Sequence, residues 1–307
     1  MMHDPTYLVV GESVADLVRA ADGRSTIHPG GSPMNVAFGL GRLGRATTLV
    51  TQLGDDDNGR TIRSHLLRAG VSVIDTGPRN QATPTATAFL DAYGAARYSF
   101  DITWNLTGPA SPPTATHVHT GSIAAYLSPG SDVVEAMVAQ LVGTATVSFD
   151  PNIRPALITD RDDAVRRTAR LLALTDVVKA SDDDLTWLYP GEAPASVARR
   201  WVEAGPTLVV VTRGAAGAIA ATADGVFHIP PVRADVVDTV GAGDSFMAAV
   251  LDGLGGEGLL GAGARSRLRN SRVDQLRPIL ERAAAAAAIT VSRAGAEPPT
   301  VAELAAV

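Results

Sequence analysis

Apolar residues along the chain fall into two patterns, short β-branched runs and longer stretches with helical spacing, and the two largely alternate. The runs predicted to be strands are residues 8–10, 47–51, 71–74, 146–149, 177–178 and 208–211. The stretches predicted to be helices are residues 59–69, 132–141, 162–174 and 194–204. Strands that are apolar on both faces and alternate with helices are typical of a parallel sheet that is covered on both sides. The pattern therefore predicts an α/β fold built on such a sheet.

Two segments interrupt this alternation. Residues 13–28 and 85–100 have the pattern of amphipathic strands, and the second includes a turn near Tyr93 and Gly94. Strands inserted into a series of strands and helices suggest a small second sheet. We expect this sheet to act as a lid over the crevice at the ends of the main strands, where a lid excludes water during a reaction.

The composition removes several classes of function. Hydrophobic residues make up 46% of the 307 residues, enough for a sizeable core, and the lack of cysteine excludes disulfides, thiolate nucleophiles and iron–sulfur clusters. The net charge of −6 argues against a nucleic-acid partner, because binding to phosphates needs clustered positive charge. The N-terminal apolar run is short for a secretory signal, and the uncharged stretch between Asp101 and Asp132 contains four prolines. We therefore expect a cytoplasmic protein with no membrane partner.

Two features of the basic residues carry information. Lys179 is the only lysine among 26 lysine and arginine residues, which marks a position where a compact ammonium is needed in place of a planar guanidinium. His117 and His119 form an H-x-H pair that places both rings on one face of a strand and could begin a metal site. No third ligand lies nearby in the sequence, so a structural role is favoured for the pair.

The first chemically informative motif is GGSPMNVAFGLGRLG, which begins at Gly30. Ser32 is a good helix N-cap and Pro33 suits the first helical position, so a helix is expected to begin here. Gly30 and Gly31 would let the backbone approach a ligand at the start of this helix, where Asn35 could point its amide. The segment also matches the dinucleotide fingerprint G-x-G-x-x-G, but its glycines end a helix and a strand follows, the reverse of the required order. We therefore exclude an NAD-binding function.

The second motif is DTVGAGDSF, which leads into an apolar helix. Gly241, Ala242 and Gly243 open this helix with free backbone N–H groups at the positive end of the helix dipole. These groups form an anion hole suited to a phosphoryl group during its transfer. Asp244 follows in the first helical turn, where it can take a proton from an attacking hydroxyl. An aspartate that only stabilises the helix N-terminus is the alternative.

The two motifs together resemble the signatures of the PfkB family of carbohydrate kinases, the ribokinase-like sugar and nucleoside kinases. The resemblance covers essentially the whole chain. It implies a single domain over residues 1–307, doubly wound around a mostly parallel sheet, with lid strands inserted from about 13–30 and 85–104. It also implies ATP-dependent phosphorylation of an alcohol with Mg²⁺, with Asp244 as the base beside the anion hole.

The resemblance assigns further residues to the sugar. Asp16 would bind it together with Gly30, Gly31 and Asn35, and a short carboxylate suits this role because its two oxygens accept from neighbouring hydroxyls. We expect Asp16 to emerge at the carboxyl end of the first strand. A turn or a cap is the alternative for a single aspartate at that place.

The segment DPNIRP, which follows the strand predicted at residues 146–149, looks like an element of fructokinase-like members. Asn152 could orient the phosphate or a magnesium-bound water. Arg154 could contact either the substrate or the phosphoryl group. A simple Asp-Pro-Asn turn is the alternative, because these residues are ordinary turn formers.

Phosphate and cations are assigned to two other places by the resemblance. Many members carry Asn-x-x-Glu after the strand that begins at residue 177, and this chain has Ser181 and Asp184 at the matching positions. Both side chains are shorter than those of the family, and a helix cap with an acidic first turn is the alternative. Lys179 is expected near the phosphates. Asp238 and Val240 match positions that hold a monovalent cation, such as K⁺, in many members.

The nucleotide is assigned to the C-terminal third of the chain. Thr212 and Gly214 resemble nucleotide-contacting positions of the family, and Gly217 allows a tight turn. The adenine pocket is expected near the start of a helix over residues 271–292.

One regularity connects these candidates. Asp16, Asp150, Lys179, Thr212 and Gly241 are all expected at the carboxyl ends of strands, in the crevice where open α/β sheets bind ligands. The sequence therefore indicates an ATP-dependent sugar kinase that phosphorylates a sugar hydroxymethyl group, and DPNIRP favours fructose as the substrate.

Several alternatives stay open. Ribose, 2-keto-3-deoxygluconate and a nucleoside are other possible substrates, and a non-catalytic sugar or nucleotide sensor is another function. A nucleoside would need a base-stacking pocket near the lid, for which the candidate aromatics are Phe89, Tyr93, Tyr98, Phe100 and Trp104. We also expect a homodimer formed through the lid, because exposed strand edges favour pairing.

Overall fold

The computed structural model describes residues 4–19, 25–90, 96–109 and 111–306. Within these residues the main sheet has nine strands, in the order β13-β12-β11-β10-β9-β8-β1-β4-β5. Their bounds are β1 (Tyr7–Val10), β4 (Thr47–Thr51), β5 (Ser72–Asp75), β8 (His117–Gly121), β9 (Thr146–Asp150), β10 (Val177–Ser181), β11 (Leu208–Thr212), β12 (Ala218–Thr222) and β13 (Gly225–Ile229). Neighbouring strands from β5 to β11 run parallel, and β12 and β13 add an antiparallel hairpin at one edge.

The predicted α/β fold with a mostly parallel sheet is confirmed. Each run predicted as a strand corresponds to one of β1, β4, β5, β9, β10 and β11, with bounds that differ by a few residues at most. The sequence did not predict β12 and β13. The strand β12 is an alanine-rich segment without strong β propensity, and it is held by pairing with β11 along its length.

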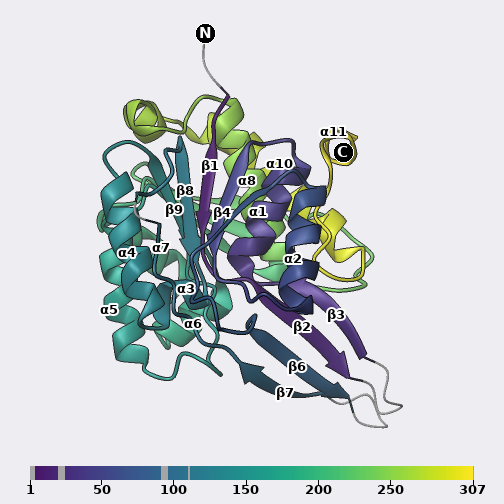
Figure 1. The fold of residues 1–307 in the computed structure, drawn as a ribbon. Helices are drawn as coiled ribbons and strands as arrows, with labels where there is room; N and C mark the ends of the chain where they lie inside the picture. The colour runs from purple at the N-terminus through teal and green to yellow at the C-terminus, as the bar shows by residue number, and fades with distance from the viewer. Residues whose placement is uncertain (1–3, 20–24, 91–95, 110, 307) are drawn as a thin grey trace.

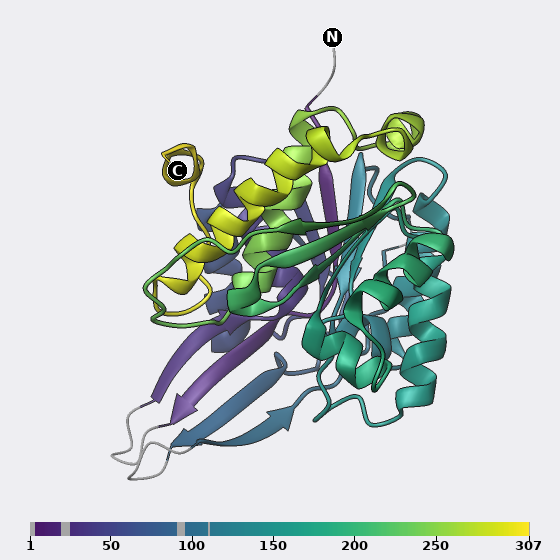
Figure 2. The same cartoon turned by 180° about the vertical axis from the view of Figure 1, so that it is seen from behind.

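Helices cover both faces of the main sheet, as Figures 1 and 2 show from opposite sides. One face carries α1 (Ser32–Arg42), α2 (Asp57–Arg68), α8 (Ala242–Gly256) and α10 (Val273–Val291). The other face carries α3 (Ile123–Tyr126), α4 (Gly130–Leu141), α5 (Arg161–Leu172), α6 (Asp182–Leu188) and α7 (Pro194–Glu203). In β1, Tyr7 and Val9 pack with the first group, and Leu8 and Val10 with the second. The short helices α9 (Arg265–Arg269) and α11 (Val301–Ala305) lie at the periphery.

A second, smaller sheet has four strands in the described part of the chain, in the order β3-β2-β6-β7. Its strands β2 (Val14–Arg19), β3 (Ser25–Gly30), β6 (Thr85–Leu90) and β7 (Ala96–Asp101) come from the two segments predicted to interrupt the alternation. It extends from one end of the main sheet, at the lower right of Figure 1. The small sheet predicted from the sequence is therefore confirmed. The turn predicted near Tyr93 and Gly94 lies outside the described residues.

The glycines of the G-x-G-x-x-G segment serve packing and chain reversal. A Cβ atom at Gly39 of α1 would lie 2.9 Å from the Cβ atom of Ala248 in α8, so glycine permits the close approach of the two helices. Gly44 has φ +74°, follows the end of α1, and precedes β4. The order is helix and then strand, as expected from the sequence.

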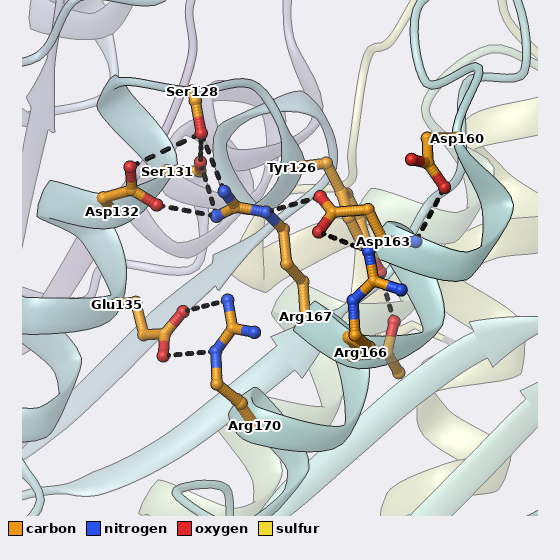
Figure 3. Close-up of polar contacts among 11 residues, drawn as sticks. Tyr126, Ser128, Ser131, Asp132, Glu135, Asp160, Asp163, Arg166, Arg167 and Arg170 are labelled. Atoms are coloured by element: carbon orange, nitrogen blue, oxygen red, sulfur yellow. Dashed lines mark hydrogen bonds and ion pairs between the residues drawn. The ribbon is translucent and has the colours of Figure 1, made fainter.

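Ion pairs join α4 to α5, as Figure 3 shows. The Arg167 guanidinium, in a side chain only 11% exposed, lies 2.9 Å from carboxylate oxygens of both Asp132 and Asp163. It also donates to two serine hydroxyls at 2.7 and 2.8 Å. Arg170 forms a bidentate pair with Glu135 at 2.8 and 3.0 Å. The pairs with Asp132 and Glu135 fasten α5 to α4, whereas the pair with Asp163 lies within α5.

The uncharged stretch between Asp101 and Asp132 folds into loops, β8 and α3. Across the described ranges, no helix has both the length and the apolar character that crossing a bilayer would require.

Candidate active site

Two adjoining cavities open at the carboxyl ends of the parallel strands. The first, of about 410 Å³, lies between the main sheet and the small sheet, and the second, of about 850 Å³, lies beside α8 and α10. Thr212, Thr239 and Gly243 line both cavities, so the two spaces meet at the start of α8.

Most of the site residues predicted from the sequence line these two cavities. The first is lined by Asp16, Gly31, Asn35, Asn152, Arg154, Lys179, Ser181, Asp184, Thr212, Val240, Gly241, Gly243 and Asp244. The second is lined by Thr212, Gly214, Gly217, Ala242 and Gly243. Gly30 and Asp238 lie next to these walls without lining either cavity.

Asp244 stands in the first turn of α8, where the two cavities meet. The helix begins after Gly241, whose φ of +75° is left-handed and whose missing Cβ would overlap Ala296 at 2.5 Å. One carboxylate oxygen of Asp244 accepts from the hydroxyl of Ser32 at 2.6 Å, and the other accepts from the amide of Asn35 at 2.8 Å. Two donors from α1 therefore fix the orientation of a carboxylate that is only 7% exposed.

Ser32 corrects one prediction from the sequence. The N-cap of α1 is Gly31, with φ +105°, and Ser32 is the first residue of the helix with no capping bond from its side chain. The tight backbone at Gly31 turns the Ser32 hydroxyl away from the helix end and toward Asp244. The serine that resembled a cap thus orients the candidate base.

Lys179 comes from β10, and its ammonium lies against the start of α8. Its Nζ atom is 2.7 Å from Oδ2 of Asp150, and a Cβ atom at Gly243 would lie 2.7 Å from the same nitrogen. Burial alone would lower the pKa of Lys179, but the surrounding carboxylates, with Asp150 first and then Asp244, outweigh it and raise the pKa. The only lysine of the chain is therefore a buried cation beside the backbone N–H groups of α8.

Asp150, at the end of β9, is fully buried. Burial raises its pKa to about 7, although the ammonium of Lys179 opposes this shift. After Asp150 the chain turns sharply, with Asn152 at φ +37°. Arg154 donates to the side-chain oxygen of Asn152 at 2.6 Å, and both line the first cavity. The DPNIRP segment thus forms a turn whose polar groups face the cavity.

Ser181 and Asp184 form a complete capping box at the start of α6. The Ser181 hydroxyl accepts from the backbone N–H of Asp184, and Oδ2 of Asp184 accepts from the backbone N–H of Ser181 at 2.8 Å. Oδ1 of Asp184 accepts from the backbone N–H of Ile153 at 2.6 Å. The geometry shows the helix cap that the sequence left open as an alternative, and it ties α6 to the DPNIRP turn.

Asp16 lies within β2 of the small sheet and not at the carboxyl end of β1, where the sequence placed it. Its side chain reaches the first cavity from the lid side, because β2 starts a few residues after β1 ends. A Cβ atom at Gly30, on the neighbouring strand, would lie 2.1 Å from Oδ2 of Asp16, so only glycine leaves room for this carboxylate. Burial raises the pKa of Asp16 to about 6, opposed by the charges of His28 and Arg154.

Two buried polar residues of the first cavity, Glu12 and Ser122, were not predicted as site residues. Glu12 is 1% exposed, and one of its oxygens accepts from the backbone N–H of Ala124 at 2.9 Å; burial raises its pKa to about 7. Ser122 is buried at φ +54°, an uncommon conformation for a residue with a side chain. A glutamate directly after a buried strand was the only signal in the sequence.

The second cavity has a largely apolar wall. It is lined by Ala284, Ala287, Ala288 and Val291, which lie in the second half of α10. The sequence placed the adenine pocket near the start of this helix, and the start does not line the cavity. Gly217, at φ +79°, packs against the backbone, since a Cβ atom there would lie 2.3 Å from the carbonyl oxygen of Ile229.

Asp238 joins two loops near the start of α8. Its carboxylate accepts from the backbone N–H of Val240 at 3.0 Å and from that of Gly295 at 2.8 Å, and these bonds lower its pKa. His117 and His119 lie inside the main sheet, bonded to hydroxyls of β9. In the described ranges, no group of three or more histidine, aspartate and glutamate side chains is arranged to hold a metal ion.

The sheet architecture, the lid and an aspartate beside bare helix N–H groups define a small-molecule kinase of the ribokinase-like class. A model of the pfkB family carbohydrate kinases matches residues 5–302. The chain therefore belongs to the pfkB family of carbohydrate kinases, which are phosphotransferases.

Proteins of known function and solved structures are similar to this chain over most of its length. A fructokinase of Klebsiella pneumoniae is 36% identical over 263 residues, which span 82% of this chain and 85% of the relative. Among solved structures, a Xylella fastidiosa fructokinase with bound ATP is similar with a TM-score of 0.84 at 25% identity, covering 99% of this chain and 98% of that one. An aminoimidazole riboside kinase of Salmonella enterica, complexed with aminoimidazole riboside and an ATP analog, has a TM-score of 0.79 at 26% identity, covering 98% and 99%.

Proposed function

We propose that the protein transfers the γ-phosphoryl group of ATP to the hydroxymethyl group of a sugar, with fructose as the substrate. The observation that carries this proposal is the position of Asp244. Its carboxylate is oriented by Ser32 and Asn35 and lies where the cavity beneath the lid meets the cavity beside α10. An acceptor hydroxyl in the first cavity and a phosphate reaching in from the second would meet at this residue.

The first cavity offers groups suited to a sugar. Asp16 reaches in from the lid, Asn35 and the backbone of Gly31 come from the start of α1, and Arg154 comes from the opposite wall. Together they present acceptors and donors from several sides, as a polyol requires. Held there, the hydroxymethyl group would lose its proton to Asp244 while its oxygen bonds to the γ-phosphorus and ADP leaves.

The start of α8 offers a site for the transferring phosphoryl group. The N–H of Ala242 donates to the carbonyl oxygen of Thr239 at 3.4 Å, whereas those of Gly241 and Gly243 make no backbone hydrogen bond among the described residues. The Lys179 ammonium lies beside Gly243. Negative charge that develops on the phosphoryl oxygens would be stabilised by these fixed donors. The second cavity would hold the nucleoside, with Thr212, Gly214 and Gly217 on one side and the alanines of α10 on the other.

Cations complete this proposal. Mg²⁺ favours oxygen ligands and keeps several waters, so it needs only one or two protein groups beside the phosphates. Asn152 and Asp184 fit this role through waters, because Oδ1 of Asp184 accepts a single hydrogen bond from the described residues, that of the Ile153 N–H, and keeps a lone pair. When bound, Mg²⁺ would neutralise phosphate charge. The loop of Asp238 and Val240 would hold a monovalent cation such as K⁺.

Fructose is supported by the fructokinase relative at 36% identity and by the DPNIRP turn at the cavity wall. A riboside is the second candidate. It is favoured by Phe100, an aromatic side chain of β7 that lines the first cavity, and by the likeness to the aminoimidazole riboside kinase. A ring at this place offers a stacking surface for a heterocyclic base.

A coupled ADP-release assay tests the proposal, with fructose, ribose, 2-keto-3-deoxygluconate and aminoimidazole riboside compared at equal concentrations. We expect the highest kcat/KM with fructose. Turnover confined to the riboside would overturn the choice of substrate. Binding of ATP and sugar without turnover would overturn the kinase proposal in favour of a sensor.

A further inference from the structure

A row of buried polar side chains crosses the main sheet beneath the active site. It runs from Thr146 through His117 and Ser148 to His119, alternating between β9 and β8, whose register pairs 117 with 146 and 119 with 148. Each of these side chains is at most 1% exposed. Ser148 of β9 pairs with Val177 of β10. Lys179 lies two positions beyond Val177, and residues two apart along a strand share a face, so the Lys179 side chain lies on the same face of the sheet as the row.

Hydrogen bonds connect the row from end to end. Oγ1 of Thr146 is 2.9 Å from Nδ1 of His117, and Nε2 of that ring is 2.7 Å from Oγ of Ser148. The same Oγ atom is 2.9 Å from Nδ1 of His119. A serine hydroxyl has one proton, so Ser148 donates to one ring and accepts from the other. Ser148 therefore orients both rings, and Thr146 holds His117 from its other nitrogen, so the bond that orients His119 does not involve His117.

The row ends in an atom without a partner. Nε2 of His119 is buried and makes no hydrogen bond to any of the described residues, whereas both nitrogens of His117 are paired. On the same face, Oδ1 of Asp150 is also buried and unpaired among the residues that the structure describes, while Oδ2 contacts Lys179. Buried polar atoms in proteins are normally paired, so two unpaired atoms on neighbouring strands call for a common explanation.

The charge state of His119 is set by its surroundings. Burial first, and then the nearby Lys179 ammonium, lowers its pKa to about 3. A neutral imidazole has one donor and one acceptor nitrogen, and Nδ1 is already used by Ser148. Nε2 is thus left for a polar group on the side of Lys179 and Asp150.

We propose that His119 is a positioning residue for the ion pair of Lys179 and Asp150. Its Nε2 engages this pair from within the sheet through one buried water and so holds the ammonium against Gly243. The inference rests on the proposed function, because Lys179 has to meet the phosphoryl group at that place. It adds that the position of Lys179 is set by a residue that lines neither cavity.

The chain offers a direct test of this role. Because Lys179 is the only lysine, ¹⁵N-lysine labelling gives a single side-chain ammonium resonance from the full-length protein. The compared proteins are the parent, His119→Leu, His119→Gln and His117→Leu. His117→Leu is the matched control, since it removes an equally buried ring of the same row and two hydrogen bonds instead of one.

We expect His119→Leu to shift the ammonium resonance and to speed its proton exchange with water at least about threefold, because one contact that immobilises Nζ is lost. His117→Leu should leave the resonance in place. His119→Gln keeps a polar group near the position of Nε2 and should restore most of the parent signal. The glutamine variant also keeps the test informative if the leucine variant fails to fold.

Kinetics give the second readout. Displacement of a phosphate-contacting ammonium should lower kcat of His119→Leu by about tenfold or more and leave the sugar KM within about threefold. An unchanged ammonium resonance in folded His119→Leu would overturn the inference. If the ammonium resonance of the parent protein does not change when an ATP analogue is added, the phosphate role of Lys179 is contradicted instead. Failure of the inference and failure of the proposed function are therefore distinguishable.

Discussion

Replacing Asp244 with asparagine removes the candidate base and keeps the shape of the side chain. General-base catalysis contributes about 10² to 10⁴ in rate, which corresponds to roughly 2.7 to 5.4 kcal/mol of the barrier. We therefore expect kcat of Asp244→Asn to fall at least about a hundredfold at saturating substrates. The sugar KM should change little, because Asp16 and Arg154 reach the first cavity from other walls.

The same structure predicts that this variant folds. Asparagine keeps one oxygen, which can still accept from Asn35, and its NH₂ group then faces the hydroxyl of Ser32. A hydroxyl can rotate to accept a hydrogen bond, so the cost to stability is about 1 kcal/mol or less. A large loss of turnover would therefore report chemistry and not unfolding.

The assay is ADP release with fructose, combined with a single-turnover measurement so that slow product release cannot hide the chemical step. Ser32→Ala is the matched control. It keeps the Asp244 carboxylate but removes the donor at 2.6 Å, so we expect a loss of roughly tenfold. Turnover of folded Asp244→Asn within tenfold of the parent would refute the assignment of the base.

Three further predictions concern other parts of the molecule. Arg167→Ala should lower the free energy of unfolding in urea by about 2 kcal/mol, because four hydrogen bonds of Arg167 are lost, two of them to α4, whereas the exposed Arg166→Ala should cost almost nothing. The sugar KM should fall as the pH rises from about 5 to 7, because the ionised form of Asp16, with its pKa of about 6, accepts from hydroxyls; an unchanged KM would contradict its role. Gly243→Ala places a methyl group 2.7 Å from Nζ of Lys179 and should lower kcat about tenfold with an unchanged melting temperature.

The sequence predicted those parts of the molecule that depend on local pattern. Buried strands of β-branched residues alternate with amphipathic helices, so most strands of the main sheet, though not β12 and β13, and the two segments of the small sheet could be located to within a few residues. The start of α8 could also be predicted, because the glycines and alanine before Asp244 suit the first turn of a helix, where backbone N–H groups have no partner within the helix. Candidates such as Lys179 and Asp150 met in one crevice because parallel strands bring their carboxyl ends together.

What the sequence could not predict depends on contacts between distant segments. Ser32 looked like a cap, and only the approach of α1 to α8 shows that its hydroxyl reaches Asp244. The sequence placed Asp16 at the end of β1, whereas it lies in β2, because no local pattern shows where β1 ends and β2 begins. The row that ends at His119 required the register of three neighbouring strands, which the residues of β8 alone do not reveal.

The balance of charge at the site depends on burial. Glu12 and Asp16 line the first cavity and Asp150 lies buried beside Lys179, so these carboxylates, if all were ionised, would repel the triphosphate that the proposed function requires. Burial raises the pKa of Glu12 and Asp150 to about 7 and that of Asp16 to about 6, so each binds a proton more readily than a carboxylate in water does. Lys179, by contrast, stays charged, because the nearby charges of Asp150, Asp244 and Asp184 raise its pKa. Burial thus weakens the negative charge of the carboxylates, while the carboxylates around Lys179 preserve its positive charge, and both effects favour the approach of an anion.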